Sequence, residues 1–492
     1  MRHAEVMSAI LEKLKSRFPQ KSFARNVLTL MSGTVSAQAL LILIAPVLTR
    51  LYGPEEFGLF ALYTSLLSVL GVISCGRYEL AIVLPKEEGE AANIFLLSLI
   101  VCLLTSLLVL PLFLVFRSNI SVILKTPALS PWLLFLPFQL FVQGVFLSLN
   151  YWGTRQKQFG RLATRQVTQS SGTALGQIGL GFLLKGHGSG LICGALFGQT
   201  LATARLAWQT LIDDGNLIRT SFSTKAQREL LSRYRDFPLF STWTGFMNTL
   251  STMLPALLLG YYFSPTIVGF YSIGQRLLSL PMTLIGGALA QAFYPHATEA
   301  FHSGHLRETT RKTFIFLVEI GLLPFSLLSL LAPDAFKLIF GLQWETAGIY
   351  IRWLALWIFF VFISSPLSTI YLVMNKQRLL LSFNLIMLVT RTISLIFGGL
   401  SDSPLLTIQL FGVTGFLLYS GNCFLILNLS GLSFSSVLFS LWKPAIESFI
   451  FTTPVLLSLA LVENSLLRVA IGTVCFAMFA AFKGTVILKK PV

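Results

Sequence analysis

Apolar segments long enough to cross a membrane recur along the whole of this chain of 492 residues. A membrane-spanning helix needs about 20 consecutive, mostly apolar residues. The chain is 54% hydrophobic and 11% charged, whereas soluble domains carry about 25% charged residues. A soluble fold of this length could not cover so much apolar surface, so the sequence predicts an all-α integral membrane protein.

Fourteen segments are predicted to span the membrane, and twelve, without the last two, is the alternative. Residues 1–26 are expected to form a cytoplasmic amphipathic segment. They carry six basic residues, and the apolar run after them continues through Leu48, which is too long for a cleaved signal peptide. The fourteen predicted spans are 27–49, 57–75, 93–116, 130–153, 166–184, 189–212, 238–262, 267–293, 313–332, 347–373, 379–400, 405–429, 443–462 and 466–485.

Lysines and arginines fall mainly on one side of the predicted membrane. The segments on the side of the N-terminus carry 26 of them, and the opposite loops carry 6. Cytoplasmic loops of membrane proteins are enriched in Lys and Arg, so both termini are predicted to be cytoplasmic. This bias also accounts for the formal net charge of +16, and a nucleic-acid partner is not expected.

The two halves of the chain share a motif at their first interhelical turn. Residues 52–60 (YGPEEFGLF) are similar to residues 262–270 (YFSPTIVGF), although chance similarity among turn residues is the alternative. A true repeat would give two six-helix bundles of the same orientation around a central cavity. The predicted domains are the N-terminal segment 1–26, a bundle 27–212, a cytoplasmic linker 213–237, a second bundle 238–429, and 430–492 with helices 13 and 14 and a cytoplasmic tail.

The segments between the predicted spans are short. None is long enough for a soluble catalytic domain, and no GxxxxGK[ST] loop is present to hold ATP. The five cysteines show no CxxC spacing. The sequence therefore indicates a transporter and not an enzyme, and no metal or cofactor is expected.

Four stretches carry motifs in a defined order, namely residues 51–58, 76–85, 269–295 and 340–357. They read LYGPEEFG, then GRYELAIVLP, then GFYS with RLLSLP and FYP, then FGLQWETAG with RWLALW. In this order and spacing they resemble the polysaccharide flippase branch of the MOP (multidrug/oligosaccharidyl-lipid/polysaccharide) exporter superfamily. The last hundred or so residues match that branch as generic spans.

The resemblance implies a flippase that moves an undecaprenyl-diphosphate-linked oligosaccharide across the bacterial inner membrane by alternating access. It implies a V-shaped pair of six-helix bundles with two added C-terminal helices. The product would serve surface polysaccharide synthesis, such as that of lipopolysaccharide O-antigen. The expected partners are the lipid-linked oligosaccharide, membrane lipids, and polysaccharide polymerase and ligase proteins.

A lipid-linked diphosphate needs a cationic path, because its bare charges would cost tens of kcal/mol in hydrocarbon. Arg276 and Arg391 lie within predicted spans and are the candidate diphosphate-binding residues. The guanidinium fork suits phosphate oxygens, and an arginine within a span should face a cavity or a partner. A structural ion pair, or a side chain that reaches the interface, is the alternative.

Three predicted spans carry polar residues at helical spacing, so that each set lies on one helix face. They are candidates for lining a wet cavity that holds sugar hydroxyls, and interhelical packing is the alternative. The sets are Ser272, Ser279 and Thr283, which share a face with Arg276; Thr244, Asn248 and Ser251; and Gln166, Ser170, Thr173 and Gln177.

Acidic residues complete the candidate site. Glu319 lies deep in a predicted span, where an ion pair with a buried arginine is expected and a coupling proton is the alternative. Arg77 and Glu79 lie in the loop after the second span. They are predicted to form a cytoplasmic gate or a local salt bridge, with direct substrate contact as the alternative.

Two other functions are alternatives to the flippase. A drug or small-cation exporter of the same superfamily would need an acidic cavity, yet the buried arginines outnumber the buried acids Glu319 and Glu447. A membrane enzyme, such as a polysaccharide polymerase or ligase, usually needs a large outer loop with catalytic residues. The sequence has no such loop, so the flippase remains the preferred interpretation.

Overall fold

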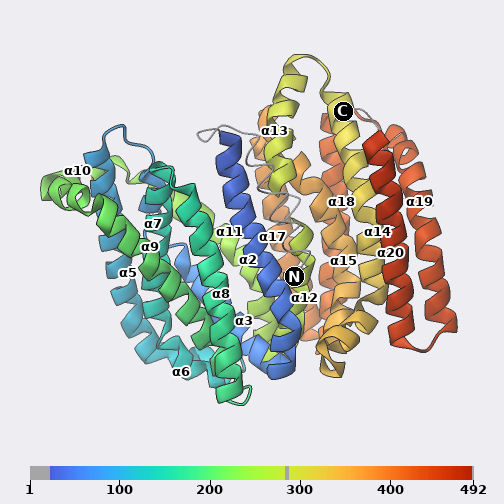
Figure 1. Cartoon of the computed structure of the whole chain (residues 1–492), viewed down its shortest axis with the longest axis horizontal. Helices are drawn as coiled ribbons and strands as arrows, with labels where there is room; N and C mark the ends of the chain where they lie inside the picture. Colours follow the sequence, from blue (N-terminus) through green and yellow to red (C-terminus); the bar gives the residue numbers. More distant parts are fainter. Residues whose placement is uncertain (1–22, 283–286, 490–492) are drawn as a thin grey trace. The chain divides into compact units, whose positions relative to one another are not determined.

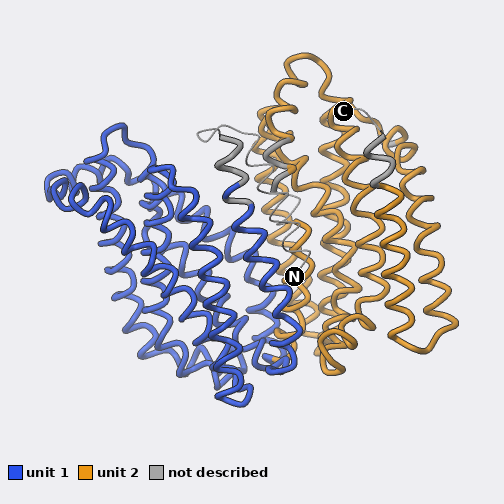
Figure 2. Tube along the Cα trace, viewed as in Figure 1, with its two compact units in different colours: residues 1–265 blue, residues 266–492 orange. Residues whose placement is uncertain are grey.

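The structure, a computed structural model, describes residues 23–282 and 287–489. All regular elements in these two ranges are helices (Figure 1), so the predicted all-α class is confirmed. The chain forms two compact units, unit 1 (Met1–Pro265) and unit 2 (Thr266–Val492), which Figure 2 draws in separate colours. Most of the predicted N-terminal segment 1–26 lies outside the described residues.

Local sequence sets where the helices of unit 1 begin. Helix α3 starts at Pro54, directly after Gly53. Proline suits a first helical turn because the N–H that it lacks would have no partner there. The longer helices of unit 1 are α2 (Phe23–Leu51), α3 (Pro54–Gly71), α5 (Glu88–Ile123), α7 (Leu136–Arg155), α8 (Phe159–Leu183), α9 (Ser189–Ser221), α10 (Thr224–Arg233) and α11 (Thr242–Tyr262).

Glycines allow α8 and α9 to pack closely. A side chain at Gly198 of α9 would collide with the backbone of α8 at Thr173, and one at Gly194 would collide with Gln177. Small residues let membrane helices approach one another in this way. Tyr52, directly after α2, donates a hydrogen bond to the Gln177 carbonyl at 2.6 Å. The three helices α2, α8 and α9 are therefore held as one layer.

The predicted linker, residues 213–237, is largely helical. It contains the end of α9 and the whole of α10, and Asn93 of α5 anchors it. The Asn93 amide donates to the Ser221 carbonyl at 2.6 Å, and its oxygen accepts the Ser223 amide at 3.1 Å. The segment is thus packed onto unit 1.

The boundary between the two units follows Pro265, because α11 packs against α3 and so belongs to unit 1. It lies within the second copy of the repeated motif, 262–270, and not in the segment 213–237. The pair of six-helix bundles, 27–212 and 238–429, stays a prediction.

Aromatic side chains fill the interior of unit 2. Phe325 of α14 contacts Phe359 and Phe362 of α15, with ring centroids 5.9 and 5.8 Å apart. Trp357 of α15 packs edge-on against Phe411 of α18 at 4.9 Å. The longer helices of unit 2 are α12 (Pro265–Leu278), α13 (Gly287–His302), α14 (Leu306–Phe340), α15 (Glu345–Leu367), α17 (Gln377–Leu400), α18 (Pro404–Leu429), α19 (Phe434–Leu461) and α20 (Ser465–Lys489).

Within the described residues, each of the fourteen predicted spans overlaps at least one helix. Among the described residues, nine helices are long and apolar enough to cross a membrane, or ten if the bent pair Pro127–Leu133 and Leu136–Arg155 is one span. Helix α3 begins with two glutamates and α8 carries a polar stripe, which lowers their hydropathy. The structure thus supports a multi-pass membrane protein with nine or ten spans, and the number fourteen stays a prediction.

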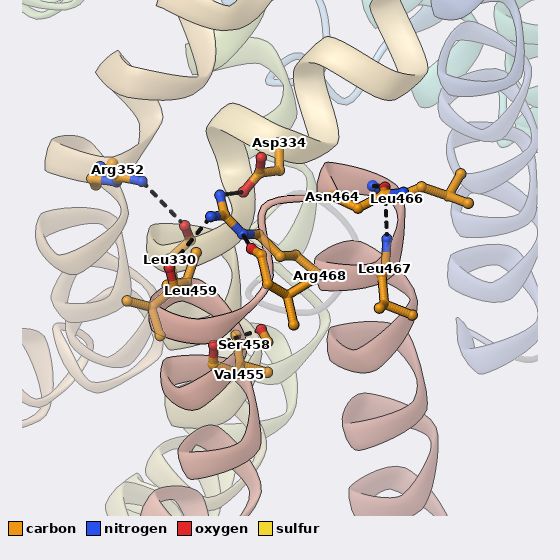
Figure 3. Close-up of polar contacts among 11 residues, drawn as sticks. Leu330, Asp334, Arg352, Val455, Ser458, Leu459, Asn464, Leu466, Leu467 and Arg468 are labelled. Atoms are coloured by element: carbon orange, nitrogen blue, oxygen red, sulfur yellow. Dashed lines mark hydrogen bonds and ion pairs between the residues drawn. The ribbon is translucent and has the colours of Figure 1, made fainter.

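One arginine anchors the C-terminal hairpin of α19 and α20 to α14 (Figure 3). Arg468 of α20 forms an ion pair with Asp334 of α14, with 3.4 Å between Nη1 and Oδ2. It also donates to the carbonyls of Val462 at 2.6 Å and Leu459 at 3.3 Å. The Asp334 side chain is only 12% exposed, so its charge depends on this partner.

Arg468→Ala is expected to lower the free energy of unfolding by about 3 kcal/mol, because it leaves the Asp334 carboxylate buried without a partner. Thermal unfolding of the purified protein would measure the loss. The surface pair of Glu308 and Lys312, which is well exposed, supplies the control, since Lys312→Ala should change nothing measurable. Equal stability of the Arg468→Ala and wild-type proteins would show that the pair does not hold the hairpin.

Candidate functional site

Arg276 lies in the last turn of α12 and is half-buried. Two serines on the same helix face bond to backbone carbonyls. Ser272 donates to Gly269 at 3.0 Å and Ser279 donates to Arg276 at 2.8 Å. Within the described residues no carboxylate pairs with the Arg276 guanidinium. Thr283, the last residue predicted on this face, lies outside the described residues.

Arg391 of α17 lies against aromatic rings. Its guanidinium carbon is 5.1 Å from the ring centroid of Trp357 and 5.8 Å from that of Phe411. Its Nε is buried without a hydrogen-bond partner among the described residues. Aromatic faces stabilise a cation but supply no negative charge, so these rings do not replace an acid partner for Arg391. Ser394 on the same helix donates to the Arg391 carbonyl at 3.0 Å.

The helices that carry Arg276 and Arg391 both contact Phe411 of α18 in unit 2. Tyr271, on the Arg276 helix, packs edge-on against Phe411 with ring centroids 6.3 Å apart, and Phe411 also contacts Arg391. The described intramembrane acids of this unit have other partners, because Asp334 binds Arg468 and both Glu319 and Glu447 bind Lys483. Neither Arg276 nor Arg391 is therefore neutralised by a described acid.

The polar stripe of α11 in unit 1 is open. Thr244 and Asn248 are exposed and Ser251 is half-buried, while Gly260 on the other side of the helix packs against Leu62 of α3. Polar side chains are unfavourable against hydrocarbon. This face is therefore suited to water or to a hydroxylated ligand, as predicted for the sugar.

The polar stripe of α8 takes part mainly in helix packing. Gln166 accepts a hydrogen bond from Thr34 of α2 at 3.2 Å. Gln177 is buried and donates to the Leu191 carbonyl of α9 at 3.0 Å, and Thr173 faces Gly198 of the same helix. These contacts give the residues the interhelical role considered as the alternative. Ser170, the remaining member of this stripe, is also buried.

Arg165 of α8 is not among the predicted site residues, because it lies between the predicted spans 130–153 and 166–184. The structure places it within α8, 8% exposed. Its guanidinium carbon lies 3.2 Å from the centroid of the Phe146 ring of α7, and its Nε has no hydrogen-bond partner among the described residues. The signal in the sequence was its position directly before the polar stripe that starts at Gln166.

Arg77 and Glu79 lie together after α3. Their charged atoms are 3.9 Å apart, and the Glu79 side chain is 2% exposed. Arg77 adopts a left-handed backbone, with a φ of 62°, and its guanidinium packs at Gly245 of α11, where a side chain would collide with it. The pair therefore links the turn after α3 to the polar helix α11 within unit 1. A role as a gate stays a prediction.

Glu79 makes stability depend on pH. Burial raises its pKa from the usual 4.5 to about 7, although its own backbone hydrogen bond and the charge of Arg77 lower it. The native state keeps the proton between these pH values, where the unfolded chain loses it, so the free energy of unfolding should fall as pH rises from about 4.5 through about 7. The fall is on the order of 3 kcal/mol. Thermal unfolding across this range should show it, and Glu79→Gln should flatten the profile. An identical pH profile for the variant would contradict this.

Glu319 of α14 forms an ion pair, and its partner is Lys483 of α20, at 3.3 Å. The prediction that this partner would be a buried arginine was wrong. The reason is that α20 packs along α14, a contact that no local pattern in the sequence reveals.

Comparisons with known proteins identify the family and the fold. A family model described as "Polysaccharide biosynthesis protein" matches residues 47–348. Among solved structures, lipid II flippase MurJ in an inward closed conformation has a TM-score of 0.67 and 15% identity, covering 94% of this chain and 99% of that chain. An inward-facing multidrug resistance MATE family transporter of the MOP superfamily has a TM-score of 0.61 and 15% identity, covering 80% and 96%. No curated protein matches the sequence. At these identities the likeness shows the fold.

Proposed function

Because the chain belongs to the polysaccharide biosynthesis protein family and has the fold of membrane transporters, we propose that it is a flippase for a lipid-linked oligosaccharide. Its substrate is an oligosaccharide on undecaprenyl diphosphate, which it moves across the bacterial inner membrane by alternating access. The product serves surface polysaccharide synthesis. The observation that carries this proposal is the pair of arginines, Arg276 and Arg391, whose charges no described acid neutralises.

The chemistry of the substrate fits these arginines. A diphosphate offers several anionic oxygens, and a guanidinium can bind two of them at once through parallel hydrogen bonds. An isolated cation inside a membrane protein is costly, so a site that keeps two of them is best explained by an anionic ligand. Within unit 1, the exposed polar face of α11, with Thr244 and Asn248, is by itself suited to sugar hydroxyls.

The rival function, export of a drug or small cation, is supported by the likeness to a MATE transporter in fold. A cationic substrate would need acids that are free to bind it. In unit 2, Asp334, Glu319 and Glu447 contact Arg468 or Lys483, whereas no described acid contacts Arg276 or Arg391. The charge pattern therefore favours an anionic substrate.

A flipping assay with the purified chain in liposomes tests the proposal. The liposomes would contain a fluorescent oligosaccharide on undecaprenyl diphosphate, and a membrane-impermeant quencher would report the outer leaflet. Without the protein, the quencher should reach only the labelled lipid of the outer leaflet. With the protein, nearly all of the labelled lipid should be quenched. A fluorescent phosphatidylcholine should stay half quenched. The flippase proposal would be rejected if the protein did not raise the quenched fraction of the diphosphate lipid. It would also be rejected if the liposomes accumulated ethidium instead.

A further inference from the structure

Arg165 of α8 is a buried charge without a counter-ion inside unit 1. The residue is 8% exposed, and its Nε is buried with no hydrogen-bond partner among the described residues. An arginine keeps its charge at physiological pH, and such a charge is costly inside a membrane protein. The stacking of its guanidinium on the Phe146 ring, at 3.2 Å from the centroid, offsets only part of this cost.

The described acids of the neighbouring helices contact other groups. Helix α8 packs against α2, α7 and α9. The described part of α2 contains no acid, and the chain has none between Glu90 and Asp213. On α9, Asp213 forms an ion pair with Arg161, and Asp214 accepts the indole N–H of Trp152 at 2.9 Å. No ion pair therefore joins a described acid of these helices to Arg165.

The Arg165 side chain does not reach for water at the near end of its helix. Helix α7 ends at Arg155 and α8 begins at Phe159, so a short turn joins them at one end. Phe146 lies nine residues before the end of α7, about 13 Å along the helix. A snorkelling arginine would turn toward the turn, whereas the contact with Phe146 holds this guanidinium deeper between the helices.

The surroundings of Arg165 follow from the packing of α7 on α8. Gly153 of α7 packs against Leu162 of α8. The two helices run antiparallel, so residues three and seven positions before Gly153 face residues three and seven positions after Leu162. The four residues at these positions form what we call the α7–α8 site: Phe146 and Asn150 of α7, with Arg165 and Gln169 of α8.

Two amides give this site its second chemical property. Asn150 and Gln169 are half-buried, and within the described residues no hydrogen bond occupies their side-chain amides. An amide both donates and accepts hydrogen bonds, as a sugar hydroxyl does. Phe146 is also half-buried, so the site reaches the surface of unit 1.

The chemistry that fits the α7–α8 site is a carboxylate on a ring that also carries hydroxyls. The Phe146 ring covers one face of the guanidinium and leaves its edge to a carboxylate, which can accept two parallel hydrogen bonds. A bare phosphate would offer acceptors only, and the amide oxygens of Asn150 and Gln169 would stay without donors. An acidic sugar supplies the negative charge and the hydroxyl donors together.

We propose that the α7–α8 site binds an acidic sugar, such as a uronic acid. Arg165 binds the carboxylate, and Asn150 and Gln169 bind the neighbouring hydroxyls. The inference rests on the proposed function and names its substrate class, because the transported oligosaccharide then contains an acidic sugar.

Binding of soluble disaccharides to the purified chain in lipid nanodiscs tests the site without any transport. Cellobiouronic acid and cellobiose differ only in a carboxylate that replaces a hydroxymethyl group. The acid should raise the melting temperature of the wild-type protein, and cellobiose should raise it much less. Equal stabilisation by cellobiose, or by sodium chloride at the same concentration, would overturn the proposal.

Variants assign the binding to Arg165. Arg165→Met should abolish the response to cellobiouronic acid. Arg205→Met is the matched control, because Arg205 is an exposed arginine of α9 that bonds to Thr168 of α8 at 3.0 Å, and it should respond as the wild type does. Without sugar, Arg165→Met should not lower the melting temperature, since it removes a charge that has no counter-ion. A lower melting temperature would show that Arg165 has a structural role instead.

Flipping of the same two disaccharides on undecaprenyl diphosphate separates this site from the proposed function. The wild-type protein should flip the acidic lipid at least about tenfold faster than the neutral one, and Arg165→Met should slow the acidic lipid alone. Equal slowing of both lipids, or equal wild-type rates, would reject the acidic sugar and leave the flippase intact. Selective binding of cellobiouronic acid by a protein that flips neither lipid would reject the flippase and leave the site.

Discussion

Arg276→Ala is expected to lower the flipping of undecaprenyl-diphosphate-linked oligosaccharide by about 10- to 100-fold. Hydrogen bonds to charged groups contribute about 1.5–3 kcal/mol each, and 1.4 kcal/mol is about a tenfold change in rate or affinity. The described residues offer Arg276 no carboxylate, so the loss would fall on the substrate and not on the fold. The liposome assay measures the rate, and surface polysaccharide in cells measures the consequence.

Conservative and control variants sharpen this test. Arg276→Lys keeps the charge but loses the planar fork, so flipping should be intermediate. Arg352→Ala removes an arginine of another helix whose guanidinium is exposed and donates to the Leu330 carbonyl at 3.4 Å, and it should flip as the wild type does. Wild-type flipping rates in both Arg276 variants would show that Arg276 does not bind the substrate.

Arg391→Ala is expected to cause a loss of at least about tenfold, again without unfolding the protein. Arg391 is held by Trp357 and Phe411 and has no described acid partner. Trp357→Leu should weaken flipping to a smaller extent, because cation–π contacts contribute about 0.5–2 kcal/mol and orient the guanidinium. The measurement is the flipping rate at saturating and limiting lipid concentrations.

Ser382→Ala is the matched control for Arg391, since Ser382 is exposed on the same helix and bonds only to the Arg378 carbonyl among the described residues. It should have no effect. If Arg391→Ala flips as well as Ser382→Ala, the aromatic cluster around Arg391 has a structural role and Arg276 acts without it.

Hydrophobic length and turn chemistry predicted most of the helices. Apolar runs bounded by Gly and Pro are local signals, and α3 and α12 both begin at a proline of the repeated motif, Pro54 and Pro265. Arg276 and Arg391 could also be singled out locally, because an arginine within an apolar run is unusual in itself. What the sequence could not show was whether an acid elsewhere in the chain neutralises them.

Partners distant in the sequence decided the rest. Glu319 and Lys483 lie on helices that no motif connects, so the ion pair could not be predicted by periodicity. The polar residues of α8 have the same spacing as those of α11, yet Gln177 bonds to α9 while Asn248 stays exposed. Helical spacing places residues on one face but does not tell which neighbour covers that face. Arg165 was missed for a simpler reason, a helix start placed several residues too late.

Binding of the bare carrier lipid to the purified chain provides the decisive comparison. Undecaprenyl diphosphate and undecaprenol share the same tail and differ in charge, so their affinities isolate the contribution of the diphosphate. The wild-type protein should bind the diphosphate lipid about 10- to 100-fold more tightly, and the double variant Arg276→Ala, Arg391→Ala should bind both lipids equally. Equal affinity of the wild-type protein for the two lipids would show that its unpaired arginines do not recognise a diphosphate.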